Sequence, residues 1–168
     1  MREITTLVES APIKRNTVES IMSKPLITLE ASSTALQAAK LMSERIVSSI
    51  VITDNDKIVG IITERDLIRL VCAMDLQASK APIASIMSSP LITIGKASTI
   101  GDAAQIMLRN KLRHLGVTDD NGSDRIVGVI SSVDLTKLLI NRLQSVDHDV
   151  PLLLRALYWQ EEPSEELE

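Results

Sequence analysis

Two short segments of the chain place a hydroxyl group three residues before a carboxylate. They are Gly60-Ile61-Ile62-Thr63-Glu64-Arg65-Asp66 and Gly128-Val129-Ile130-Ser131-Ser132-Val133-Asp134. Thr63 with Asp66 fits a capping box, in which side chains cover the free backbone N–H groups of a helix start, and Ser131 with Asp134 repeats it. A carboxylate in the first turn after a strand would also accept hydrogen bonds from the two hydroxyl groups of a ribose. The N–H groups beside it suit a phosphate. The residues alone leave both interpretations open.

A phosphate favours fixed cations nearby. Arg113 and His114 enter a predicted strand, with Lys111 just before them. We expect Arg113 and His114 to supply positive charge to a bound phosphate. The alternative is a solvated strand entrance without a ligand.

Residues suited to catalysis are few. His114 and His148 are the only histidines, and no Cys/His cluster has the spacing of metal ligands. Asp147-His148-Asp149 would either chelate a divalent ion or simply face solvent. The chain has neither a Gly-x-Ser-x-Gly nucleophile elbow nor a Walker phosphate loop. We therefore predict a protein that binds a ligand and is not an enzyme.

The chain contains an internal repeat. Ser20–Thr28 recurs as Ser85–Thr93 and differs only where Lys24 is replaced by Ser89. The later matches are Ile58–Thr63 with Ile126–Ser131 and Asp66-Leu67 with Asp134-Leu135. Each copy has too few elements to bury its apolar face alone, so we expect the two copies to pack on each other.

Apolar spacing and turn residues predict three strands and two helices in each copy. The first copy has a helical turn at Val18–Met22, strands at Leu26–Leu29, Ser49–Thr53 and Ile58–Thr63, a hairpin turn at Asp54–Asp56, and helices that start at Ser33 or Thr34 and after Thr63, the second running toward Ala73. The second copy has strands at Leu91–Ile94, His114–Thr118 and Arg125–Ser131, and helices at Thr99–Arg109 and Ser132–Leu143. The predicted fold class is α/β (α+β), with two small three-stranded sheets packed pseudo-symmetrically.

The chain divides into five predicted regions. They are an N-terminal segment at 1–15, the first repeat at 16–74, a linker at 75–82, the second repeat at 83–145, and a tail at 146–168 that is partly helical and then acidic. Tyr158 and Trp159 are the only aromatic residues. Leu152–Trp159 would contact a partner or cover the protein's own core.

Composition narrows the function. A net charge of -4 and a pI near 5.3 give no broad basic field, which argues against a nucleic-acid partner. No apolar run approaches the ~20 residues that cross a bilayer, and Met1–Ser10 lacks an apolar signal segment. We therefore expect a cytoplasmic protein that does not contact a membrane. Cys72 lies in an apolar stretch and is expected to be a buried thiol.

Both copies, over nearly all of residues 14–145, resemble the cystathionine-β-synthase (CBS) domain, and a tandem pair of this kind is called a Bateman module. The residues that carry the likeness are Ile21-Met22 with Pro25–Thr28, Ile86-Met87 with Pro90–Thr93, the two Gly-to-Asp segments and Leu112–Leu115. The resemblance implies a regulatory module with no obligatory cofactor. It would bind an adenosine-containing ligand (AMP, ADP, ATP or S-adenosylmethionine) in clefts between the repeats, form a homodimer and signal to a protein partner. Gly116 stands where the family often has Pro, which we expect to loosen the strand entrance.

Carried over residue by residue, the resemblance implies two sites. In the first site, Asp134 would accept hydrogen bonds from the ribose. Ser131 and Val133 would line the phosphate side, and Arg113 and His114 would bind the phosphate. The base would lie against Thr28, Val47 and Ser48. The mirror site would use Asp66 with Thr63 and Arg65, and Thr93, Leu112 and Arg113 near the base.

The two expected sites differ in charge. Ser48-Ser49 stand in the first copy where the second has Arg113-His114. The mirror site therefore lacks matching cations, unless Arg45 or Arg65 turns toward it, and we expect the Asp134 site to bind a phosphorylated adenosine ligand more tightly. One alternative is a structural or oligomerisation module whose clefts stay empty. The other is an enzyme acting on nucleotides, which the missing acid/base pair disfavours.

Overall fold

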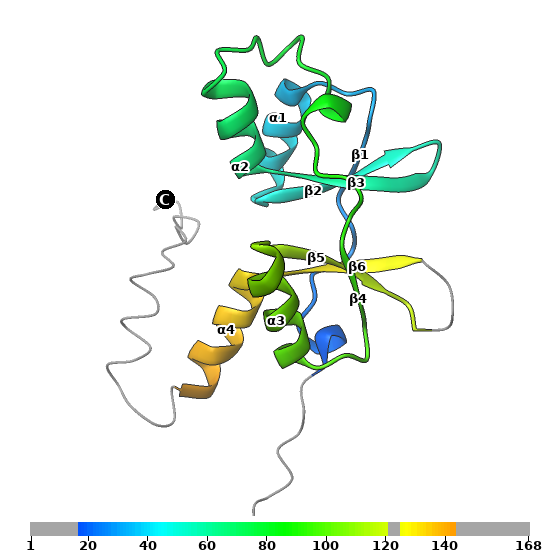
Figure 1. Ribbon diagram of the computed structural model, residues 1–168, viewed down its shortest axis with the longest axis vertical. Helices are drawn as coiled ribbons and strands as arrows, with labels where there is room; N and C mark the ends of the chain where they lie inside the picture. The colour runs from blue at the N-terminus through cyan, green and yellow to red at the C-terminus, as the bar shows by residue number, and fades with distance from the viewer. Residues whose placement is uncertain (1–16, 121–124, 144–168) are drawn as a thin grey trace, which may run out of the picture.

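The computed structural model describes residues 17–120 and 125–143, which form two halves of the same design, one above the other in Figure 1. The first half contains β1 (Thr28–Glu30), α1 (Ala35–Arg45), β2 (Ser49–Asp54), β3 (Lys57–Thr63), α2 (Glu64–Leu67) and the π-helical η2 (Ile68–Cys72). The second contains β4 (Thr93–Gly95), α3 (Ile100–Asn110), β5 (His114–Thr118), β6 (Ile126–Ser131) and α4 (Ser132–Leu143). Two short 3-10 helices, η1 (Val18–Ser20) and η3 (Ile83–Ser85), come before the strands of each repeat. The predicted fold class is confirmed.

The two sheets have the same topology. β1 runs parallel to β2, and β2 runs antiparallel to β3; β4, β5 and β6 repeat this order. Ser49 is paired with Thr63, and His114 is paired with Ser131. Because Thr63 and Ser131 end their strands, this register places the start of each middle strand beside the start of the following helix.

Local sequence signals explain the element boundaries. Thr34 and Thr99 cap α1 and α3, each forming a reciprocal capping box with the residue three positions later. Between β2 and β3, Asn55 and Asp56 have φ angles of 49° and 61°, the left-handed pair that a two-residue type I′ hairpin turn requires. The predicted hairpin turn at Asp54–Asp56 is therefore confirmed.

Each half has its own aliphatic core, and the opening segment of each repeat is built into the other half. Val18, at the start of the first repeat, is fully buried in the second core beside Leu115 and Ile130. Ile83, at the start of the second repeat, is fully buried in the first core beside Ile50 and Ile62. Figure 1 shows the two connecting segments crossing between the halves. Each packed half therefore contains the opening segment of the other sequence repeat. The two halves cannot separate without exposing both cores.

The glycine of each Gly-to-Asp segment lies where an exchanged segment crosses the last strand. Beside Gly60, Ile61 and Ser88 exchange backbone hydrogen bonds of 3.0 and 2.9 Å. Beside Gly128, Ser23 and Val129 exchange bonds of 2.8 and 3.2 Å. A Cβ on Gly60 would lie 2.6 Å from the carbonyl oxygen of Ser88, so the crossing excludes a side chain there.

Several local predictions were wrong. The first strand of each sheet starts two residues later than predicted, at Thr28 and Thr93. The expected burial of Cys72 is wrong: the thiol is exposed, because η2 turns it away from the core side that Val71 occupies. The helix that carries it runs over the predicted residues, as α2 and then, from Ile68, as the π-helical η2. The Gly116 position is tight, since a Cβ there would lie 2.8 Å from Leu91 Cδ2. Asp147–Asp149 and Leu152–Trp159 lie outside the described residues.

Candidate functional site

Asp66 and Asp134 both cap the helices that they start. The Oδ2 atom of Asp66 accepts hydrogen bonds from the backbone N–H and the hydroxyl of Thr63, at 2.8 and 2.7 Å. Asp134 Oδ2 accepts the same two bonds from Ser131, at 2.8 and 2.7 Å. The predicted capping boxes are confirmed. Both boxes use one carboxylate oxygen, and within the described residues no hydrogen bond to the other oxygen, Oδ1, is formed in either aspartate.

The two halves meet through a side-chain hydrogen bond between the starts of their middle strands. Ser48 Oγ lies 3.2 Å from His114 Nε2, and both side chains are partly buried. Ser48 directly precedes β2 and His114 begins β5, so the contact lies at the strand starts that are paired with Thr63 and Ser131, the hydroxyl partners of the two aspartates. The two candidate sites therefore adjoin at one point between the halves.

Backbone hydrogen bonds tie this contact to both helix starts. The N–H of Glu64, the first residue of α2, donates to the carbonyl oxygen of Ser48 at 3.1 Å. The N–H of Ser132, the first residue of α4, donates to the carbonyl oxygen of Arg113 at 2.9 Å. These bonds satisfy one otherwise free N–H group at each helix start. They also fix Ser48 and Arg113 in equivalent places in the two halves.

His114 is neutral at neutral pH. Burial, and after it the positive charge of Arg113, lower the pKa of His114 from its ordinary 6.5 to about 4. Asp134 and Asp66 act in the opposite direction, and Arg65 adds to the lowering. Charged groups of both halves, Arg113 and Asp134 in the second and Asp66 and Arg65 in the first, therefore act on one imidazole. In the protein without ligand the buried His114 imidazole is therefore uncharged at neutral pH, and Arg113 is the cation of the pair. That Arg113 and His114 bind a phosphate stays a prediction.

The Ser48–His114 pair does not have the properties of a nucleophile and its base. A general base works best with a pKa near the operating pH, and a pKa of about 4 makes this imidazole a weak base at neutral pH. Both nearby carboxylates are engaged in capping boxes. The pair is suited to holding two strands together and to hydrogen bonding with a polar ligand.

The remaining candidate residues occupy equivalent positions in the two halves. Val47 and Leu112 are partly buried against the first and second cores, and each would offer an apolar wall. Thr28 and Thr93 begin β1 and β4 and are exposed. Val133 is partly buried in α4, and Arg65 is exposed in α2. Across residues 17–120 and 125–143, no hydrogen bond joins Thr28 or Thr93 to either aspartate.

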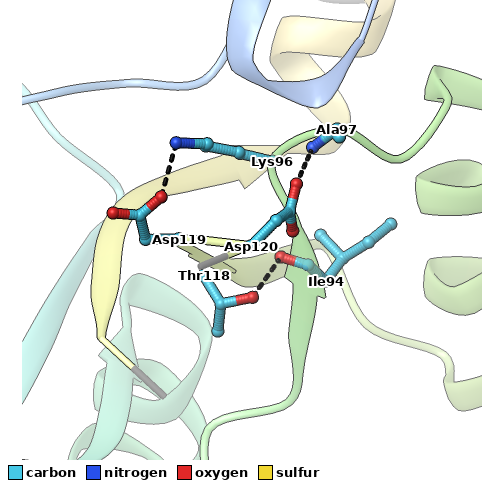
Figure 2. Close-up of polar contacts among 6 residues, drawn as sticks. All are labelled: Ile94, Lys96, Ala97, Thr118, Asp119 and Asp120. Atoms are coloured by element: carbon cyan, nitrogen blue, oxygen red, sulfur yellow. Dashed lines mark hydrogen bonds and ion pairs between the residues drawn. The ribbon is translucent and has the colours of Figure 1, made fainter. Parts of the chain in front are cut away.

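One polar cluster was missed by the sequence reasoning. Figure 2 shows Lys96 paired with Asp119, and Asp120 accepting a 2.6 Å hydrogen bond from the N–H of Ala97. The cluster ties the end of β5 to the segment after β4. Comparing the repeats would have revealed it, because Lys96 stands where the first copy has Ala31. No group of His, Cys, Asp and Glu in the described part of the chain is arranged to hold a metal ion.

Fold and contacts together define a tandem-repeat protein whose two α/β halves meet at paired strand starts beside equivalent capped aspartates. The sequence pattern of the CBS domain matches residues 18–73 and again residues 83–141. A 17.7 kDa protein of Acidianus ambivalens is 30% identical over 125 residues, which are 74% of this chain and 73% of that protein. The chain belongs to the CBS domain family.

Two further relatives are longer than the matched region. A Methanopyrus kandleri protein is 30% identical over 122 residues, and a Methanocaldococcus jannaschii protein is 31% identical over 125 residues. These matches cover 72% and 74% of this chain, but only 61% of the first relative and 40% of the second.

Solved structures of CBS domain pairs share this fold. The CBS domain pair of protein MJ0100, in complex with 5'-methylthioadenosine and S-adenosyl-L-methionine, has a TM-score of 0.68 at 29% identity over 76% of this chain and 98% of that one. A CBS domain protein from Pyrobaculum aerophilum complexed with AMP has a TM-score of 0.63 at 26% identity over 83% and 98%. Within the residues that the structure covers, no helix is long and apolar enough to span a membrane.

Proposed function

We propose that this chain is a regulatory module that binds an adenosine-containing ligand between its two halves and passes the bound state to a protein partner or through self-association. The observation that carries the proposal is the placement of Asp66 and Asp134, in identical capping boxes, around one contact between the halves. In each aspartate the capping box leaves Oδ1 for the ribose hydroxyl groups. The adenosine ligands bound by two related CBS pairs support this class of ligand.

The Asp134 site is the stronger of the two in this proposal. Arg113 supplies a fixed cation beside the start of α4, where Ser132 N–H is held by the Arg113 carbonyl. Ser131 and Val133 line the phosphate side, and Thr28, Val47 and Ser48 receive the base. The Asp66 site has the neutral Ser48 in the equivalent place and relies on Thr63, Arg65, Thr93 and Leu112. A phosphorylated ligand such as AMP, ADP or ATP therefore favours the Asp134 site.

Self-association is part of the proposal. Large apolar side chains are exposed on the helices of both halves or just after them, with Ile46 82% and Leu108 78% exposed, and Ile68, Met74 and Leu139 also over half exposed. Association of two copies that covered these side chains would remove their apolar surface from water, which is favourable. We assign it to a homodimer in the cytoplasm, whose shape would change with the bound ligand.

Thermal unfolding with and without ligand tests the function. A ligand at a hundred times its dissociation constant adds about 2.7 kcal/mol to the free energy of unfolding. We expect AMP, ADP, ATP or S-adenosylmethionine to raise the melting temperature by several degrees, and GMP at the same concentration to raise it less. A structural module with empty sites would melt at the same temperature with each of these five compounds as without any of them, and that result would refute the proposal.

A further inference from the structure

We infer that the hydrogen bond between Ser48 and His114 couples the two candidate sites, so that ligand bound at one weakens binding at the other. This inference rests on the proposed function, because it concerns two sites for the same class of ligand. Ser48 and His114 act here as positioning residues whose bond transmits the state of one site to the other.

A short series of hydrogen bonds connects the two aspartates through this pair. On the first side, the capping box holds Asp66 to Thr63, and the next residue, Glu64, donates to the carbonyl oxygen of Ser48 at 3.1 Å. The hydroxyl of Ser48 then meets His114 at 3.2 Å.

On the second side the series continues in the same way. The carbonyl oxygen of Arg113, the neighbour of His114, accepts the N–H of Ser132 at 2.9 Å. Ser131, the residue before Ser132, holds Asp134 at 2.8 Å. Each step is a hydrogen bond or a single peptide link, so a shift at one helix start reaches the other.

The geometry at the centre makes the coupling negative. At 3.2 Å the Ser48–His114 hydrogen bond is at the long end of the usual range, and it joins two groups that are neutral at neutral pH. A phosphate beside Arg113 offers His114 a charged acceptor, and hydrogen bonds to charged groups are stronger than neutral ones. When His114 turns to the phosphate, Ser48 loses its partner, and the start of α2 beside Asp66 is held less firmly.

Titration calorimetry with AMP measures this coupling as a ratio of affinities. Asp66→Ala and Asp134→Ala each leave one site and give its intrinsic binding constant. The product of these constants, compared with the overall constant of the two-site protein, is the coupling factor. The same three measurements on a Ser48→Ala background give a second factor. Any direct contact between Ser48 and the ligand affects the intrinsic constants and the overall constant alike, so its loss cancels in the coupling factor.

We expect the second AMP to bind about fivefold or more weakly than its intrinsic constant in the natural sequence, and within about twofold of it in Ser48→Ala. Ser49→Ala is the matched control, since it removes the neighbouring hydroxyl and leaves the Ser48–His114 bond in place; it should keep the coupling. His114→Gln, whose amide reaches the same position, should retain coupling that His114→Ala loses.

Several results would overturn the inference. Repulsion between two bound phosphates would weaken the second binding step equally in the natural sequence and in Ser48→Ala. A coupling factor that is the same in both proteins would therefore contradict the inference. Independent sites in the natural sequence, or one AMP per chain with an affinity that Ser48→Ala does not alter, also contradict it. No AMP heat in the natural sequence and in either single-site variant would instead refute the proposed function itself, which is a distinguishable outcome.

Discussion

The carbonyl oxygen of Ser88 occupies the space where a side chain at Gly60 would begin. A Cβ atom at Gly60 would lie 2.6 Å from this oxygen, closer than real Cβ atoms approach. Gly128 meets the other crossing segment, with a Cβ position 2.7 Å from Met22 Sδ and 3.1 Å from the Ser23 carbonyl oxygen. The two glycines thus permit the exchange of opening segments that joins the halves into one unit.

Gly60→Ala is expected to destabilise the protein. The backbone carbonyl of Ser88 has to move to admit the methyl group, and overpacking of this kind costs about 1–3 kcal/mol. Gly101→Ala is the control: its Cβ would lie an ordinary 3.6 Å from Thr99 Oγ1 in α3, where alanine is favoured over glycine by about 1 kcal/mol. Urea unfolding should show a lower midpoint for the first variant and a higher one for the second. Equal midpoints would mean that the crossing at Ser88 is not tight.

The sequence was sufficient for most of the local structure. The repeat, the hairpin turn at Asp54–Asp56 and the capping pairs of Asp66 and Asp134 depend on neighbouring residues, and local rules predicted them. The exchange of Val18 and Ile83 between cores was not predictable, because it depends on contacts between segments far apart in the chain.

The site was predicted only in part from the sequence. Arg113 and Ser48 were recognised as counterparts by alignment of the repeats. The protonation state of His114 was not recognised, since it depends on burial between the halves, which no single segment reveals. Gly60 and Gly128 were recognised as parts of the repeated pattern. The requirement for glycine at both positions comes from the crossing segments, which leave no room for a side chain.

The pH dependence of stability should show the burial of His114. In the folded protein its pKa is about 4, against the ordinary 6.5 of the unfolded chain. Between pH 6.5 and pH 4 the unfolded chain therefore binds a proton that the folded protein does not, and the free energy of unfolding falls as the pH falls. At about 1.4 kcal/mol per pKa unit the loss is about 3 kcal/mol at most.

His114→Gln isolates this contribution, because the carboxylates titrate in both proteins. Chemical unfolding at several pH values between 7 and 4 should give a shallower decline for His114→Gln, and the difference should grow toward pH 4. Parallel curves for the two proteins would show that His114 is not held neutral by the fold.

Arg113→Gln should separate recognition of the phosphate from recognition of the nucleoside. A charge-assisted hydrogen bond contributes about 1.5–3 kcal/mol, so AMP affinity should fall about tenfold or more, and adenosine affinity should change far less. Arg125→Gln is the matched control, because Arg125 lies next to β6 at the end of the sheet opposite His114. An equal loss for AMP and adenosine in Arg113→Gln would contradict a phosphate role.

The most direct test compares two aspartates with the same capping role. Asp102 caps α3 through Thr99 as Asp134 caps α4 through Ser131, with hydroxyl bonds of 2.7 Å in both boxes. Asp102→Ala and Asp134→Ala each remove the same half of a capping box, so the two variants should lose a similar, small amount of stability. Only Asp134 is assigned to the ligand. Calorimetric titration with AMP should show an affinity within about twofold of the natural sequence for Asp102→Ala, and a loss of about tenfold or more for Asp134→Ala. Equal AMP affinity in the two variants would show that Asp134 is a helix cap alone and would contradict the account.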